Sequence, residues 1–136
     1  MFSTIGALGR RLRLGVIGGG AKSFIGPVHR AAARMDDNYE VVASVLSSDP
    51  DRARKGGIAI GIAPDRAYGS VEEMLAAERS RSDGIDVVAI MSPNDSHYRY
   101  CVAAIDAGYD VICDKPLATR LEDALHLVRR VEAAGI

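Results

Sequence analysis

Two glycines, Gly18 and Gly20, follow the apolar segment 12–17 and precede a helical pattern, which is the arrangement of a phosphate-binding loop. The first would permit a tight turn, and the second a close approach of the backbone to a pyrophosphate. Ser23 stands at the third fingerprint position, where Gly or Ala is usual, and Gly26 could provide the close helix contact. A glycine-rich turn without a ligand is the alternative, but the place between strand and helix favours phosphate at the helix N-terminus.

Such a loop needs a sheet to position it, and the pattern of the chain predicts one. Short apolar runs alternate with helical periodicities, as in right-handed β-α-β crossovers. We therefore expect an α/β fold of the Rossmann type with three layers, in which helices cover both faces of a doubly wound, mostly parallel sheet of about five strands. The expected strands are residues 12–17, 40–46, 67–68, 85–91 and 110–114, and the expected helices are residues 27–35, 50–57, 71–79, 95–107 and 120–134.

The expected helices carry start signals of three kinds. Asp49 followed by Pro50 is typical of an N-cap and the first helical residue. Pro27 suits the first position of its own helix, because its missing N–H has no partner there. Two capping boxes, each a hydroxyl residue with Glu three residues later, are Ser70 with Glu73 and Thr119 with Glu122.

The composition is that of one ordinary globular domain, with 136 residues, 48% hydrophobic and 26% charged. We divide the chain into an N-terminal extension, 1–11, and a dinucleotide-binding domain, 12–136. A net charge of −1 offers no field to attract nucleic acid, and no apolar run approaches the ~20 residues of a membrane span. We therefore expect a cytoplasmic protein that binds neither nucleic acid nor a membrane. Its three histidines are scattered, and we expect no metal site among them. Cys101 and Cys113 are expected to be reduced thiols in the core.

The exit of the second expected strand bears on the choice of cofactor. A NAD-binding fold usually has an acidic residue there to hold the ribose hydroxyls, and this chain has Ser47 instead. Ser47, Ser48 and the nearby Arg52 would tolerate or prefer the 2′-phosphate of NADP. The two serines could equally do no more than precede a helix cap, so the cofactor is expected to be NAD or NADP.

Two further motifs follow the last two expected strands, Ser92-Pro93-Asn94-Asp95-Ser96-His97 and Asp114-Lys115-Pro116. Together they resemble the Gfo/Idh/MocA family of NAD(P)-dependent sugar and cyclitol oxidoreductases. That family carries Thr/Ser-Pro-Asn-x-x-His at the first turn and Glu-Lys-Pro at the second, where this chain has Asp114 for the usual Glu. The spacing between the motifs and the intervening helix also match, and the resemblance extends from Leu14 onward.

The resemblance implies a role for each motif residue. Lys115 would lie near the nicotinamide and the substrate hydroxyl and act as acid or base, or hydrogen-bond the reacting oxygen, if burial lowers its pKa. A surface lysine at a strand end is the alternative, and for His97 the alternative is a local hydrogen bond at a helix start. Pro116 would follow a cis bond. The residues implied to line the cofactor in these motifs are Ser92, Pro93, Asn94, His97, Asp114 and Pro116.

The function expected from these features is hydride transfer between NAD(P) and a sugar- or cyclitol-like hydroxyl or carbonyl. The resemblance also implies a second domain, which in the family supplies most of the substrate pocket and often the oligomer contacts. We therefore expect a homo-oligomer at full length, and we expect this chain to bind NAD(P)H without oxidising polyols. The alternatives are a nucleotide-binding module without turnover and an unrelated Rossmann-like protein that binds S-adenosylmethionine.

Overall fold

The computed structural model describes residues 4–136 of the chain. Its strands are β1 (Leu12–Gly18), β2 (Tyr39–Val45), β3 (Val87–Met91) and β4 (Asp110–Cys113). Its helices are α1 (Thr4–Leu8), α2 (Ile25–Met35), α3 (Pro50–Ala59), α4 (Val71–Arg79), α5 (His97–Asp106) and α6 (Leu121–Ala134), with short 3-10 turns η1 (Pro64–Arg66) and η2 (Asn94–Ser96).

All strand pairs in the sheet are parallel, and the strand order is β2-β1-β3-β4. This confirms the predicted doubly wound α/β fold. Within residues 4–136 the sheet has four strands rather than about five, because the expected strand at 67–68 is a single bridge between Ser44 and Ala67. Tyr68 N donates to Ser44 O, and the chain then leaves the sheet for the cap of α4.

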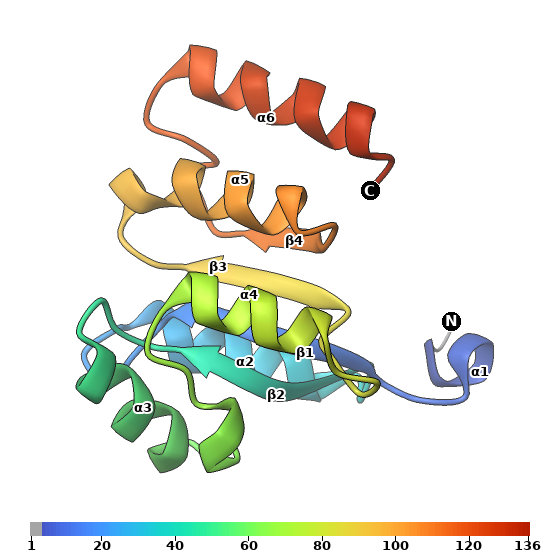
Figure 1. The fold of residues 1–136 in the computed structure, drawn as a ribbon, viewed down its shortest axis with the longest axis vertical. Helices are drawn as coiled ribbons and strands as arrows, with labels where there is room; N and C mark the ends of the chain where they lie inside the picture. Colours follow the sequence, from blue (N-terminus) through green and yellow to red (C-terminus); the bar gives the residue numbers. More distant parts are fainter. Residues whose placement is uncertain (1–3) are drawn as a thin grey trace.

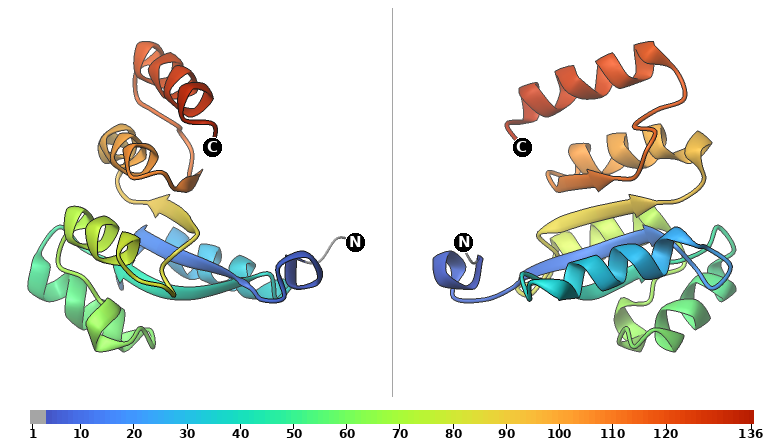
Figure 2. Two further views of the ribbon diagram at one scale, coloured as in Figure 1. Left: turned by 45° about the vertical axis from the view of Figure 1, so that its right-hand side comes forward. Right: turned by 180° about the vertical axis from the view of Figure 1, so that it is seen from behind.

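The helices form a layer on each face of the sheet (Figures 1 and 2). On one face α2 covers side chains of β1, β2 and β3, including Val16 and Ala89, which are fully or almost fully buried. On the other face α3, α4 and α5 cover a larger core built around Ile17, Val88 and Ile90. Beyond β4, α6 packs on α5 and extends that helical layer past the last strand (Figure 1).

Two of the predicted helix caps are confirmed. Asp49 Oδ1 accepts a hydrogen bond from Arg52 N at 2.8 Å at the start of α3, and Ser70 Oγ accepts one from Glu73 N at 3.1 Å at the start of α4. The box at 119–122 is wrong, since Arg120 occupies the N-cap position of α6 and makes no side-chain cap.

Three helix boundaries also differ from the expectation. Helix α2 begins at Ile25, so that Pro27 is its third residue, still within the first turn where a missing N–H is tolerated. The expected helix 95–107 begins as the 3-10 turn η2 and becomes α-helical at His97. Helix α3 continues through Gly56 and Gly57 to Ala59. Gly57 has no room for a side chain, since a Cβ there would lie 2.5 Å from Ser44 Oγ and 2.8 Å from Ala67 Cβ.

A buried ion pair joins η1 to α4. Arg66 Nε donates to Glu78 Oε1 at 2.9 Å, and Glu78 is 1% exposed. The same carboxylate also accepts hydrogen bonds from Tyr68 Oη at 2.8 Å and from Ile85 N at 3.1 Å. These bonds satisfy the buried charge and hold the chain entering β3 against α4.

Candidate functional site

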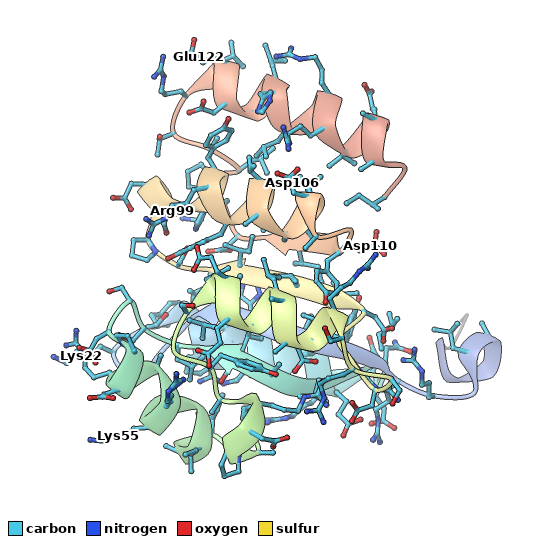
Figure 3. The ribbon with its side chains drawn as sticks, viewed as in Figure 1. Lys22, Lys55, Arg99, Asp106, Asp110 and Glu122 are labelled. Carbon is cyan, nitrogen blue, oxygen red and sulfur yellow. The ribbon has the colours of Figure 1, made fainter. Side chains whose placement is uncertain are left out.

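Because the four strands are parallel, all their exits lie at one edge of the sheet. Figure 3 shows Lys22 of the glycine loop and Arg99 of α5 at this edge, whereas Asp110, the first residue of β4, lies at the opposite edge. The glycine loop leaves β1 between the exits of β2 and β3, since β1 lies between those strands. The strand order reverses at this point, because β2 lies on one side of β1 and β3 lies on the other. Open α/β sheets bind ligands at such a reversal.

The glycine loop is packed too closely for larger residues. Gly18 and Gly19 have φ values of +79° and +75°, a backbone conformation that favours glycine. A Cβ on Gly18 would lie 2.6 Å from Ser92 Cα, and one on Gly20 would lie 2.6 Å from Leu46 O. The loop is therefore wedged between the exits of β3 and β2, and the glycines at both expected positions are required by this packing.

The third close contact of the fingerprint is made by Gly26 and not by Ser23. A Cβ on Gly26 would lie 2.2 Å from Gly19 O, so the first turn of α2 rests directly on the loop. Ser23 instead accepts a hydrogen bond from Gly26 N at 3.2 Å through its Oγ, and its own N–H donates to Gly20 O at 2.8 Å. Ser23 thus closes the loop and orients the start of α2.

The start of α2 fits a bound diphosphate. Among the described residues, the first turns of α3, α4 and α6 contain acidic side chains, whereas those of α1, α2 and α5 contain none. The positive end of the α2 dipole is therefore left without a neighbouring carboxylate from its own first turn. Arg30, which our sequence reasoning missed, donates from Nη1 to Gly19 O at 2.9 Å. Burial, and then the nearby Arg34, lower the pKa of Arg30.

The exit of β2 carries the residues expected to select the cofactor. Ser47 Oγ accepts a hydrogen bond from Asp49 N at 3.1 Å, and so it takes part in the turn that caps α3. Ser48 is exposed, and the Arg52 side chain is 74% exposed with its Nε 3.6 Å from Asp49 Oδ1. Arg52 is thus free to reorient toward an anion at this exit, where Asp49 provides a carboxylate.

The exit of β3 is held by hydrogen bonds of its own side chains. Ser92 Oγ and Ser96 Oγ lie 2.7 Å apart, and Ser96 Oγ donates to Pro93 O at 2.7 Å. Pro93 and Asn94 are exposed at the edge, as expected of residues that line a ligand. His97 is different, because it is only 1% exposed and its two ring nitrogens contact the carbonyl oxygens of Ser92 and Pro116.

The exit of β4 brings Asp114 and Lys115 to the same edge. Asp114 N donates to Ile90 O at 2.9 Å, and the Lys115–Pro116 peptide bond is cis, as the resemblance implied. Lys115 is exposed at this edge. His29 is half-buried, with Nε2 3.5 Å from Asp114 Oδ1. It lies one helical turn beyond Gly26 on α2.

A family model described as an oxidoreductase family with a NAD-binding Rossmann fold matches residues 12–136. The chain belongs to this family, Gfo/Idh/MocA. Membership confirms the predicted resemblance, and it identifies the chain as a NAD-binding oxidoreductase domain. The match favours the dinucleotide prediction over the S-adenosylmethionine alternative.

Relatives within the Gfo/Idh/MocA family are substantially longer than this chain. The uncharacterized oxidoreductase YfiI of Bacillus subtilis (strain 168) is 39% identical over 111 residues, which are 81% of this chain and 28% of the relative. Inositol 2-dehydrogenase 3 of Saccharopolyspora erythraea is 36% identical over 127 residues, which are 91% of this chain and 33% of the relative. The chain therefore spans about a third of the length of these relatives.

A solved structure of the Gfo/Idh/MocA family shows the same fold. The inositol dehydrogenase homolog of Azotobacter vinelandii, crystallised in complex with NADH and myo-inositol, has a TM-score of 0.89 and 36% identity, covering 93% of this chain and 33% of that one.

Within the described part of the present chain, none of the helices combines the length and the apolar character that a membrane crossing requires.

Proposed function

We propose that this chain is the NAD(P)-binding domain of an oxidoreductase that transfers a hydride between a nicotinamide cofactor and a hydroxyl or carbonyl of a sugar or cyclitol. The observation that carries the proposal is the meeting of the glycine loop and the Asp114-Lys115-Pro116 turn at one edge of a parallel sheet. The substrate class is supported by the relatives, whose names include inositol dehydrogenases.

The glycine loop and the start of α2 would hold the pyrophosphate. Gly18 and Gly20 allow the backbone to approach it, and the N–H groups of the first turn of α2 point toward the same edge. Arg30 fixes the Gly19 carbonyl, which keeps the following N–H of Gly20 oriented toward the edge. The remaining lining residues in this proposal are Ser23, Ser92, Pro93, Asn94, Asp114 and Pro116.

Lys115 would act on the proton of the reacting hydroxyl. When bound, the nicotinamide ring supplies the hydride chemistry. The Lys115 Nζ would take the hydroxyl proton as the alcohol is oxidised and return it as the carbonyl is reduced, or hydrogen-bond the oxygen throughout. Its exposure at the sheet edge leaves the amine able to reach a substrate.

The exit of β2 would decide between NAD and NADP. An exposed arginine and two serines favour a 2′-phosphate, whereas the Asp49 carboxylate repels one and suits ribose hydroxyls. The solved relatives bound to NADH or NAD+ support NAD as a ligand. We therefore propose that the chain binds NAD and that Arg52 also admits NADP. A cytoplasmic location is supported by Cys101 and Cys113, which are free thiols.

Titration of the chain with NADH and with NADPH tests this proposal. We expect saturable binding of NADH, measured by calorimetry or fluorescence. Arg52→Ala should weaken the binding of NADPH and leave the affinity for NADH unchanged. Lys55→Ala is the matched control, because Lys55 projects from the outer side of the same helix, α3 (Figure 3). If neither NADH nor NADPH binds, the dinucleotide proposal is refuted.

Turnover by the full-length protein, and not by this chain, separates the main proposal from a nucleotide-binding module that has no reaction of its own. The chain mixed with NAD and myo-inositol is expected to produce no NADH, because most substrate contacts are expected from a further domain. In full-length protein, Lys115→Ala should lower kcat by about 10²–10⁴-fold, the usual contribution of a general acid or base. An unchanged kcat would show that Lys115 is not the acid or base.

A further inference from the structure

The ring of His97 links two strand exits that are separate in the sequence. His97 begins α5, and its side chain is 1% exposed. Its Nδ1 lies 2.7 Å from the carbonyl oxygen of Pro116, beyond β4, and its Nε2 lies 2.7 Å from the carbonyl oxygen of Ser92, beyond β3. Both distances are those of short, direct hydrogen bonds.

These two contacts determine how many protons the ring carries. A backbone carbonyl oxygen can only accept a hydrogen bond, so each ring nitrogen must donate to satisfy its partner. A neutral imidazole has one N–H, and its other nitrogen would direct a lone pair at a carbonyl lone pair across 2.7 Å. The ring is too buried for water to take over either bond, and only the imidazolium form satisfies both carbonyls.

The surroundings of His97 also suit a positive charge. Its titratable neighbours are Cys113 and Asp114 at the end of β4, followed by Lys115, while His29 reaches the same carboxylate from α2. The Cys113 thiol near the ring, and Asp114 as the next residue, are groups that can carry a negative charge.

We propose that His97 is held as an imidazolium ion and that it is the positioning residue for Lys115, because it binds the Lys115–Pro116 turn to the exit of β3. Ser92 Cα lies against Gly18, so the same bond places that turn relative to the glycine loop. The consequence for the cofactor rests on the proposed function; the protonation of the ring does not. His97 thus acts through Lys115 and the two backbone turns and does not touch the ligand.

Nitrogen NMR of the histidine side chains tests the protonation directly. In the 15N-labelled chain at pH 7, both ring nitrogens of His97 are expected to show the chemical shifts and proton couplings of N–H groups. His97→Gln assigns the signal, and His29 and His126 provide internal references in the same spectrum. A His97 nitrogen with the shift of an unprotonated imidazole nitrogen would overturn the proposal.

The positioning role is tested with His97→Gln, whose amide can donate to one carbonyl but cannot reach both. NADH affinity is expected to fall by about tenfold, the equivalent of one lost charge-assisted hydrogen bond. His126→Gln on α6 is the matched control, since His126 bonds the Tyr98 hydroxyl away from the sheet edge, and should bind NADH like the wild type. A folded His97→Gln variant with unchanged NADH affinity would refute positioning.

The proposed function and the proposal for His97 can be refuted independently of each other. If the wild-type chain does not bind NADH, the proposed function fails, while the NMR signature of His97 still decides whether the ring is an imidazolium ion. If His97→Gln does not fold, the wild-type spectrum remains the test of protonation. His97→Asn then replaces it as the test of positioning. A change in the backbone amide signal of Lys115 in the folded variant reports that the turn has moved.

Discussion

The carbonyl oxygen of Gly19 lies against the Cα of Gly26, so close that a Cβ on Gly26 would approach it to 2.2 Å. The contact is between backbone and backbone, and no side chain can rotate away to relieve it. It joins the loop after β1 to the first turn of α2, the two elements that would surround a pyrophosphate. The position of α2 at the site therefore depends on the absence of a side chain at residue 26.

Replacing Gly26 with alanine should move the helix away from the loop. We expect Gly26→Ala to lower the free energy of unfolding by about 1–3 kcal/mol, as overpacking does, and to weaken NADH binding. Urea unfolding and NADH titration measure the two effects. Gly6→Ala is the control, because a Cβ on Gly6 would meet nothing within 4 Å, and a similar loss in both variants would contradict the packing argument.

Replacing Glu78 with glutamine should destabilise the whole domain. The neutral amide leaves the buried Arg66 guanidinium with only the half-exposed Asp83 carboxylate, 3.6 Å away, and removal of the buried partner of such a pair costs about 3–5 kcal/mol. The midpoint of urea denaturation should fall accordingly. Glu72→Gln, at an exposed position of the same helix, should change the free energy of unfolding by less than about 0.5 kcal/mol.

Asp86 should contribute to the acid sensitivity of the fold. The hydrogen bonds from Arg10, at 2.6 and 2.9 Å, hold the pKa of Asp86 below its ordinary value, and burial opposes them. A carboxyl whose pKa is depressed in the folded state stabilises that state above the unfolded pKa of about 4 and loses this contribution as the pH falls through its folded pKa.

Asp86→Asn is therefore expected to be less stable than the wild type at pH 7, with a difference that shrinks as the pH falls below about 4. Thermal unfolding at a series of pH values measures this difference. Asp110→Asn is the control, because Asp110 is exposed at the start of β4. A stability difference for Asp86→Asn that is constant at all pH values would contradict the ion-pair explanation.

Cys113 should be the more reactive of the two thiols. The hydrogen bond from Cys101 is the main cause that lowers the pKa of Cys113 to about 7, whereas Cys101 is buried and its own pKa is raised. Since the thiolate is the nucleophile, alkylation by iodoacetamide should increase most steeply near pH 7 and map to Cys113.

The two substitutions of Cys101 distinguish the cause. Cys101→Ala removes the hydrogen-bond donor and should raise the pKa of Cys113, so alkylation at pH 7 becomes slower. Cys101→Ser retains a donor and should leave the rate close to that of the wild type. Equal rates in the alanine variant and the wild type would mean that the thiol–thiol hydrogen bond is not the cause.

Much of the fold could be predicted because its signals are local. The caps at Asp49 and Ser70 involve residues three apart, and the apolar runs of β1 and β3 are contiguous. The cap at Thr119 failed although its pattern is the same, because the chain path after the Lys115–Pro116 turn begins α6 one residue later. The strand at 67–68 failed for a similar reason, since the cap of α4 ends its pairing after one bridge.

The sequence by itself determined the parallel Rossmann sheet, the glycine loop and the motifs that identify the family. The tertiary structure decided which residues meet: Gly26 against Gly19, Arg30 on the Gly19 carbonyl, His29 beside Asp114 and His97 between two strand exits. The physical reason is the range of the interactions. Periodicity and caps operate within one element, whereas these contacts exist only once parallel crossovers bring four strand ends to the same edge.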